Sequence, residues 1–293
     1  MKKCIIIPML LFFFYAFGQS NIKTYSGEMI TPKDILGLLI DNATKGKGIY
    51  SYYERENGER VKHGKFEFIY YCNNKNSVSG QYSNGKKEGV WNFLTYGFSN
   101  QIYDKFSVTY KGDSLNGAYK FILYYILSVP SIICSGNLFN GYNVGDVKIE
   151  TPNSKGFIKV FFNERGWAHG MWQIERKDGI PLKQEREYFE GILLRVVELD
   201  LSSGEKKVLF EQPKETITQI KSTFNVSNST LMISGEKFKR IKDDNNNDFD
   251  SRLFQNSTGS KSVEELFNDS DSPTISEFLP LCNGFARLEK VSK

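Results

Sequence analysis

The fold of this chain is decided by one stretch, Gly80-Gln81-Tyr82-Ser83-Asn84-Gly85-Lys86-Lys87-Glu88-Gly89-Val90-Trp91-Asn92-Phe93. Its Asn84-Gly85 pair lies between two runs with aromatic residues, and both central residues of a type I′ turn need a positive φ, which these two residue types tolerate. The stretch therefore predicts a β-hairpin. The arm after the turn reads glycine, any residue, aromatic, any residue, apolar.

This arm recurs along the chain, which makes it the unit of a repeat. Its glycines stand at 64, 89, 117, 145 and 170, at spacings of 25, 28, 28 and 25 residues. A sixth copy at Arg195 keeps the apolar pair and loses the glycine. A bulky residue precedes each arm: Tyr53, Tyr82, Tyr110, Leu138, Phe162 and Tyr188. The predicted structural repeat residues are Gly64, Phe66, Phe68, Gly89, Trp91, Phe93, Gly117, Tyr119, Phe121, Gly145, Val147, Ile149, Gly170, Trp172, Ile174, Val197 and Leu199.

The two apolar positions of each arm are two residues apart, so they share one face of a strand. In stacked hairpins each position becomes a buried cross-strand ladder. The residues between them are polar and are expected to face water: Lys65, Asn92, Lys120, Lys148, Gln173 and Glu198. Glycine weakens a strand, so we expect a neighbouring aromatic ring to lie over each repeat glycine.

The repeat resembles the MORN repeat, in the variant found in YwqK-like antitoxin-type proteins. The match is close at residues 80–93, fair at 64, 117 and 170, and degenerate at 145 and 195, so that it covers roughly residues 49–200. The resemblance implies an open, elongated array of successive β-hairpins that serves as a scaffold or interaction surface.

The flanking segments predict a mainly β protein of four parts. Residues 1–18 read as a signal peptide, 19–48 as an N-terminal cap with a short helix from Thr31 to about Asn42, and 49–201 as an array of about six hairpins. The helix is expected to cover the open edge of the first hairpin, Tyr50 to Phe68. Residues 202–293 are expected to form a small α+β or helical cap, with a helix after Pro213, a partly flexible loop at 225–261 and a last helix opened by a capping box at Ser262.

The first residues predict export. Lys2 and Lys3 precede an apolar run from Ile5 to Phe17, and the small residues Ala16 and Gly18 favour cleavage before Gln19. The mature chain is then periplasmic or secreted, and no later stretch is apolar and long enough to span a membrane. Three cysteines remain, Cys72, Cys134 and Cys282. Two of them could form a disulfide, or all three could be separate buried thiols, and separate thiols are favoured.

Catalytic and metal-binding patterns are weak. Gly80 to Lys86 matches the start of a phosphate-binding loop, but Lys87 replaces the required Ser or Thr and the context is a hairpin. The two histidines, His63 and His169, each precede a repeat glycine, so they are expected to occupy one outward repeat position about 35–40 Å apart, too far to share a metal. The acidic run 243–250 lacks the glycine and glutamate of a calcium loop.

The composition fits a globular protein: of 293 residues, 40% are hydrophobic and 25% charged, and the formal charge of +4 does not favour nucleic acid. Stacked repeats build extended binding surfaces and need no cofactor. We expect an exported, non-enzymatic repeat protein that binds a protein, a glycan or an envelope component. An immunity or antitoxin-like protein that neutralises a toxin is the alternative, and an enzyme with a site in the C-terminal region is the third.

Overall fold

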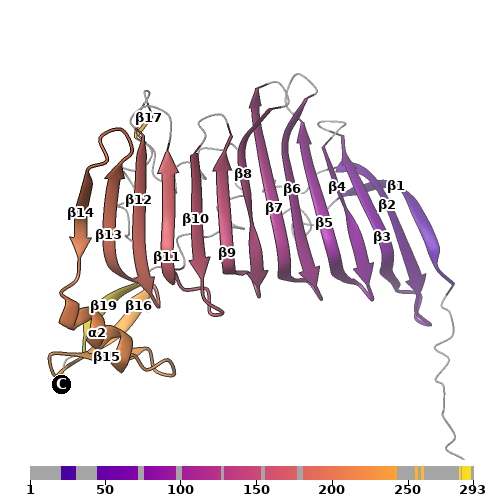
Figure 1. The fold of residues 1–293 in the computed structure, drawn as a ribbon. Coiled ribbons are helices and arrows are strands. Elements are labelled where there is room, and N and C mark those ends of the chain that lie inside the picture. Colours follow the sequence, from indigo (N-terminus) through magenta and orange to yellow (C-terminus); the bar gives the residue numbers. More distant parts are fainter. Residues whose placement is uncertain are drawn as a thin grey trace, which may run out of the picture.

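The computed structural model of the chain is a mainly β protein with an open sheet (Figure 1). It describes residues 21–30, 45–71, 76–96, 101–126, 129–152, 156–176, 181–242, 255–256, 259–260, 284 and 286–291. The predicted signal peptide, the helix after Thr31, the acidic run 243–250, the capping box at Ser262 and two cysteines, Cys72 and Cys282, lie outside these residues. Among the described residues, no helix has the length and apolar character needed to cross a membrane.

Fourteen strands follow one another across the sheet in chain order, each antiparallel to its neighbours. They are β1 (Lys23–Ile30), β2 (Lys45–Glu54), β3 (Arg60–Tyr70), β4 (Ser77–Ser83), β5 (Lys86–Tyr96), β6 (Ile102–Lys111), β7 (Ser114–Ile126), β8 (Val129–Phe139), β9 (Tyr142–Thr151), β10 (Gly156–Phe162), β11 (Gly170–Arg176), β12 (Leu182–Phe189), β13 (Ile192–Asp200) and β14 (Lys206–Glu211). Short turns join most neighbours, as the glycine-containing turn sequences predict.

The N-terminal end of the array is extended by a strand. β1 pairs with β2 over its whole length, from Lys23 opposite Tyr52 to Ile30 opposite Lys45. The expectation that a helix covers the first hairpin is therefore wrong for the edge of β2, because backbone pairing satisfies that edge directly. The hairpin itself, β2 and β3 around Asn57-Gly58, is confirmed.

One face of the sheet, here the inner face, carries the apolar ladder. The repeat residues from Phe66 to Ile174 lie on it, and none of their side chains is more than 5% exposed. The intervening strands complete each rung with Val78, Phe106, Val108, Cys134, Ile158 and Val160. Burying each large side chain contributes about 1.5–3 kcal/mol, so the ladder is the main source of the stability of the array.

The backbone conformation explains why glycine stands at the repeat positions. Each has a positive φ, from +68° at Gly170 to +113° at Gly117. In the first four repeats three residues around the glycine face one residue of the neighbouring strand, as in a β-bulge; Ser51, for example, faces residues 63–65. The expectation that an aromatic ring lies over each repeat glycine is wrong. It lies instead over Gly80 on β4, where an added Cβ would meet the Trp91 ring at 2.3 Å.

The apolar ladder ends before β13. The pairing register of β12 with β13 differs from the expected register, in which Val197 and Leu199 continue the ladder. Ile174 faces Gln184, and Gln184 faces Glu198, so Val197 and Leu199 belong to the opposite face. The reason is the bulge: two extra residues in earlier repeats preserve the alternation, whereas the single extra residue Leu194 reverses it. The inner face therefore ends in a polar rung, in which Arg186 Nε donates to Gln184 Oε1 at 2.7 Å and Gln184 Nε2 donates to Glu198 Oε2 at 3.4 Å.

A C-terminal unit packs at the foot of β12 and β13 (Figure 1). It contains α2 (Lys214–Thr223), β15 (Thr230–Ile233), β16 (Glu236–Lys242) and β19 (Ala286–Lys290), with a separate pair β17 (Gln255–Asn256) and β18 (Gly259–Ser260). The helix after Pro213 is confirmed. A loop over 225–261 is wrong for residues 230–242, because Ser234-Gly235 forms a turn and Leu231 packs with Ile220 against β13.

Candidate functional site

A buried polar cluster lies where the C-terminal unit meets the array. At its centre is Glu190, in the turn Glu190-Gly191 between β12 and β13. Glu190 has a φ of +55° and is only 6% exposed. The matching turns carry Asn84 and Asn140, residues that tolerate this conformation better than glutamate does. A glutamate kept at a strained turn indicates that its carboxylate has a tertiary role.

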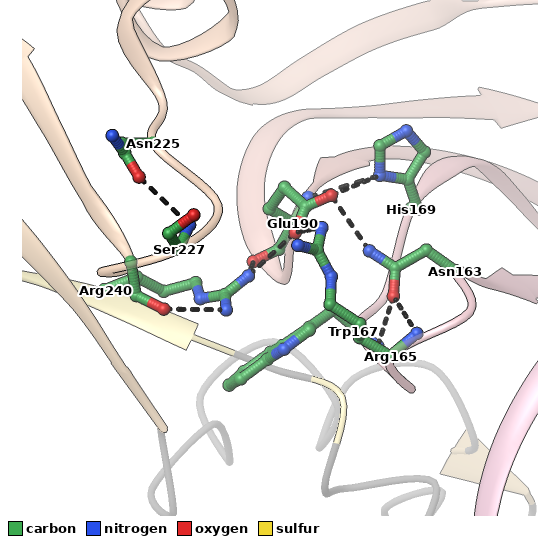
Figure 2. Close-up of polar contacts among 9 residues, drawn as sticks. Asn163, Arg165, Trp167, His169, Glu190, Asn225, Ser227 and Arg240 are labelled. Carbon is green, nitrogen blue, oxygen red and sulfur yellow. Dashed lines mark hydrogen bonds and ion pairs between the residues drawn. The ribbon is translucent and has the colours of Figure 1, made fainter.

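Both oxygens of the Glu190 carboxylate are engaged (Figure 2). Oε1 accepts a hydrogen bond from Asn163 Nδ2 at 2.9 Å, and Oε2 contacts two guanidinium groups, those of Arg165 at 2.6 Å and Arg240 at 2.8 Å. Asn163 in turn accepts the backbone N–H groups of Arg165 and Trp167, both at 3.0 Å, and so fixes the loop that presents Arg165. A buried carboxylate requires such pairing, because taking an unpaired charge out of water is costly.

Arg240 carries the connection to the C-terminal unit. It comes from β16, and its guanidinium lies 3.9 Å from the centroid of the Trp167 ring and 5.0 Å from that of Phe224. It also donates to the Glu190 carbonyl at 3.2 Å and to Ser229 Oγ at 3.1 Å. Burial lowers the pKa of the Arg240 guanidinium, and the Glu190 carboxylate opposes that shift. The Arg240 guanidinium therefore joins the C-terminal unit to the last hairpins of the array.

Glu190, Asn163, Arg165 and Arg240, here called the Glu190 clamp, hold two parts of the chain together. A catalytic carboxylate must reach a substrate, but Glu190 is enclosed by its two arginines and Asn163. The nearest histidine, His169, lies 3.7 Å from Oε1 and accepts the Glu190 backbone N–H at 3.4 Å through Nδ1. In the described part of the chain, no three His, Cys, Asp or Glu side chains are grouped so that they could hold a metal ion.

The two histidines occupy one repeat position, and it is not simply outward. His63 Nδ1 accepts the backbone N–H of Asn84 at 3.3 Å, just as His169 accepts that of Glu190. In the second repeat Glu88 Oε2 accepts from Gly112 N at 2.9 Å. Side chains at this position therefore stabilise the turn of the next hairpin, which gives the histidines a structural role.

The opposite, outer face of the sheet carries a continuous polar row. Strand pairing aligns one residue per strand from β5 to β10, namely Asn92, Ser107, Lys120, Ser135, Lys148 and Lys159, here called the outer polar row. The polar residues expected to face water at 65, 92, 120 and 148 are exposed, whereas Gln173 and Glu198 are half-buried.

Two shallow hollows lie along this face and meet at Val90. One is lined by β1 to β5, including Lys65, Glu67 and Asn92. The other is lined by β5 to β9, including Ser107, Lys120 and Lys148. Their volumes are about 580 and 510 Å³. Together they make an extended depression that crosses the strands, lined by polar and apolar side chains, with Asp146 in the second hollow and Glu67 in the first.

Two features of these sites were not predicted from the sequence. The Glu190 clamp joins the loop after β10, the turn between β12 and β13, and β16. The local signal was a Glu-Gly turn where three of the other hairpins have Asn-Gly. Each hollow is lined by residues of five strands that a sequence pattern does not bring together. The stretch Gly80 to Lys86, which only partly matches a phosphate-binding loop, lies in the β4–β5 hairpin as expected, with a strand on both sides. Comparison with protein-family models and with curated proteins returned no match to this chain.

Proposed function

We propose that this protein is an exported, non-enzymatic repeat protein whose hairpin array offers its outer face to a protein, a glycan or an envelope component. The outer polar row is the observation that carries the proposal. It runs uninterrupted over six neighbouring strands, and repeat arrays use such extended surfaces for binding.

The proposal includes the finer architecture, an array of about six MORN-like repeats ended by a C-terminal cap. Hydrogen bonds that recur between successive hairpins support it. Gly85 N donates to Lys62 O at 2.8 Å, Asp113 N to Lys87 O at 3.0 Å, and Gly141 N to Leu115 O at 3.0 Å. Each acceptor stands two residues before a repeat glycine, so each hairpin binds the next in the same way.

A binding role for the outer face is also supported by the difference in accessibility between the two faces of the sheet. The inner face is filled by the apolar ladder and is closed to partners. The carboxylate of the Glu190 clamp is fully engaged. The outer face is exposed at Asn92, Lys120 and Lys148, so it is the surface that a partner can reach.

Site-directed cross-linking tests this function. A photo-reactive residue replaces the half-buried Ser107 on the outer face, and a control replaces Glu215 on α2, which is exposed. Both proteins are expressed in the native host, irradiated, purified and examined by mass spectrometry. We expect discrete cross-linked products from position 107 and not from position 215. Equal labelling at both positions, or none at 107, would contradict the proposal.

Export is tested separately. Intact mass spectrometry of the protein from the native host should give a mature N-terminus at Gln19. A soluble cytoplasmic pool that keeps residues 1–18 would contradict this part of the proposal.

A further inference from the structure

The outer polar row differs in composition from a protein–protein interface. Its members are three lysines, two serines and one asparagine. Lysine and serine are depleted in protein interfaces, which favour aromatic residues, methionine and arginine at their centres. Hydroxyl, amide and ammonium groups are instead the donors and acceptors that match a heavily hydroxylated polymer.

The charge of the row is positive from β5 to β10, although the same register continues to Glu67 on β3 and Glu185 on β12, and Asp146 also lines the second hollow. Lys148 Nζ pairs with Glu150 at 2.8 Å. Lys120 and Lys159 form no ion pair with any described residue, although both are exposed. Ammonium groups held on a strand without an acidic partner are complementary to a ligand that carries carboxylates.

The geometry of the row suits a linear chain. One side chain stands on each strand, so successive members are about 4.8 Å apart. This is close to the advance of one sugar ring in an extended polysaccharide. From β5 to β9, short serines at 107 and 135 alternate with the longer Asn92, Lys120 and Lys148, and this section borders the second hollow. A chain laid across the strands would present one ring to each side chain.

We propose that the outer polar row binds a linear anionic polysaccharide, with uronate carboxylates on Lys120, Lys148 and Lys159 and ring hydroxyls on the serines and Asn92. The proposal rests on the proposed function, since it names the partner class of the same face. The polymer would cross β5 to β10 nearly perpendicular to the strands, with its section over β6 to β9 in the second hollow and its end on Lys159 beyond it.

Affinity electrophoresis of the full chain tests the proposal. The gels contain polygalacturonate as the anionic probe or dextran as the neutral one. The test variant is Lys120→Gln with Lys159→Gln, and the matched control is Lys207→Gln with Lys237→Gln, which removes two exposed lysines from β14 and β16. Circular dichroism melts establish that all proteins are folded.

We expect polygalacturonate, and not dextran, to retard the wild-type protein. The test variant should lose about tenfold in affinity, because two charge-assisted contacts are removed, while the control changes less than about twofold. The proposal is overturned if polygalacturonate does not bind, if the test variant binds as well as the control, if dextran binds equally, or if single-stranded DNA binds at least as tightly. A protein cross-linked at position 107 without polygalacturonate binding would overturn this inference and leave the proposed function standing.

Discussion

Asp104 gives the sharpest test of the buried ladder, because it is a carboxyl group on the apolar inner face. It lies on β6 opposite Thr95 and Leu123 and is 2% exposed, and its Oδ2 has no hydrogen-bond partner. Burial raises the pKa of this carboxyl from 3.8 to about 6, against a smaller opposing effect of the Thr95 hydrogen bond.

The sign of the pH dependence follows from the raised pKa. Below pH 3.8 the group is protonated in both the folded and the unfolded chain, and the folded state carries no penalty. As the pH rises from there to about 6, the unfolded chain loses its proton first, so stability falls. The shift of about two pKa units corresponds to a total loss of about 3 kcal/mol, of which about 2.4 kcal/mol falls between pH 4 and pH 7.

Urea unfolding of the wild type and of Asp104→Asn measures this effect. The amide does not titrate, so the stability of the wild type relative to the variant should be about 2.4 kcal/mol greater at pH 4 than at pH 7. Asp146→Asn, which alters an exposed carboxylate on the outer face, is the control and should show a difference below about 0.5 kcal/mol. A wild-type-to-variant difference that stays constant between the two pH values would refute the burial of Asp104 in an apolar core.

Three further predictions address packing, reactivity and the clamp. Phe93→Ala, at a side chain with no exposed surface, should lower the free energy of unfolding by about 3–5 kcal/mol, whereas Asn92→Ala on the outer face should change it by less than about 0.5 kcal/mol; denaturant melts that gave equal losses would contradict the face assignment. Cys134 is fully buried and its pKa is raised to about 12 by burial, so a thiol reagent should label it only after unfolding, and rapid labelling of the native protein would be unexpected. Glu190→Gln leaves the buried Arg240 without its counter-charge and should cost about 3–5 kcal/mol, with early proteolysis of the C-terminal unit; an unchanged melt and digest would show that the clamp is not needed.

The sequence by itself determined the hairpins and the inner face. Asn84-Gly85 fixes a turn because few residue types accept two positive φ values, and alternation at Trp91 and Phe93 fixes which side chains are buried because successive residues of a strand point to opposite faces. These are local rules, and they also gave the helix after Pro213. Each depends only on neighbours within a few residues.

The tertiary structure decided the features that depend on how strands meet. The size of the bulge before β13 set the register there, and one residue of difference moved Val197 and Leu199 to the other face. The pairing of β1 with β2 and the Glu190–Arg240 contact, whose members are 50 residues apart, likewise arise from long-range packing. A sequence pattern carries no separate signal for such contacts, because the free energy that selects them comes from pairing segments that are distant along the chain.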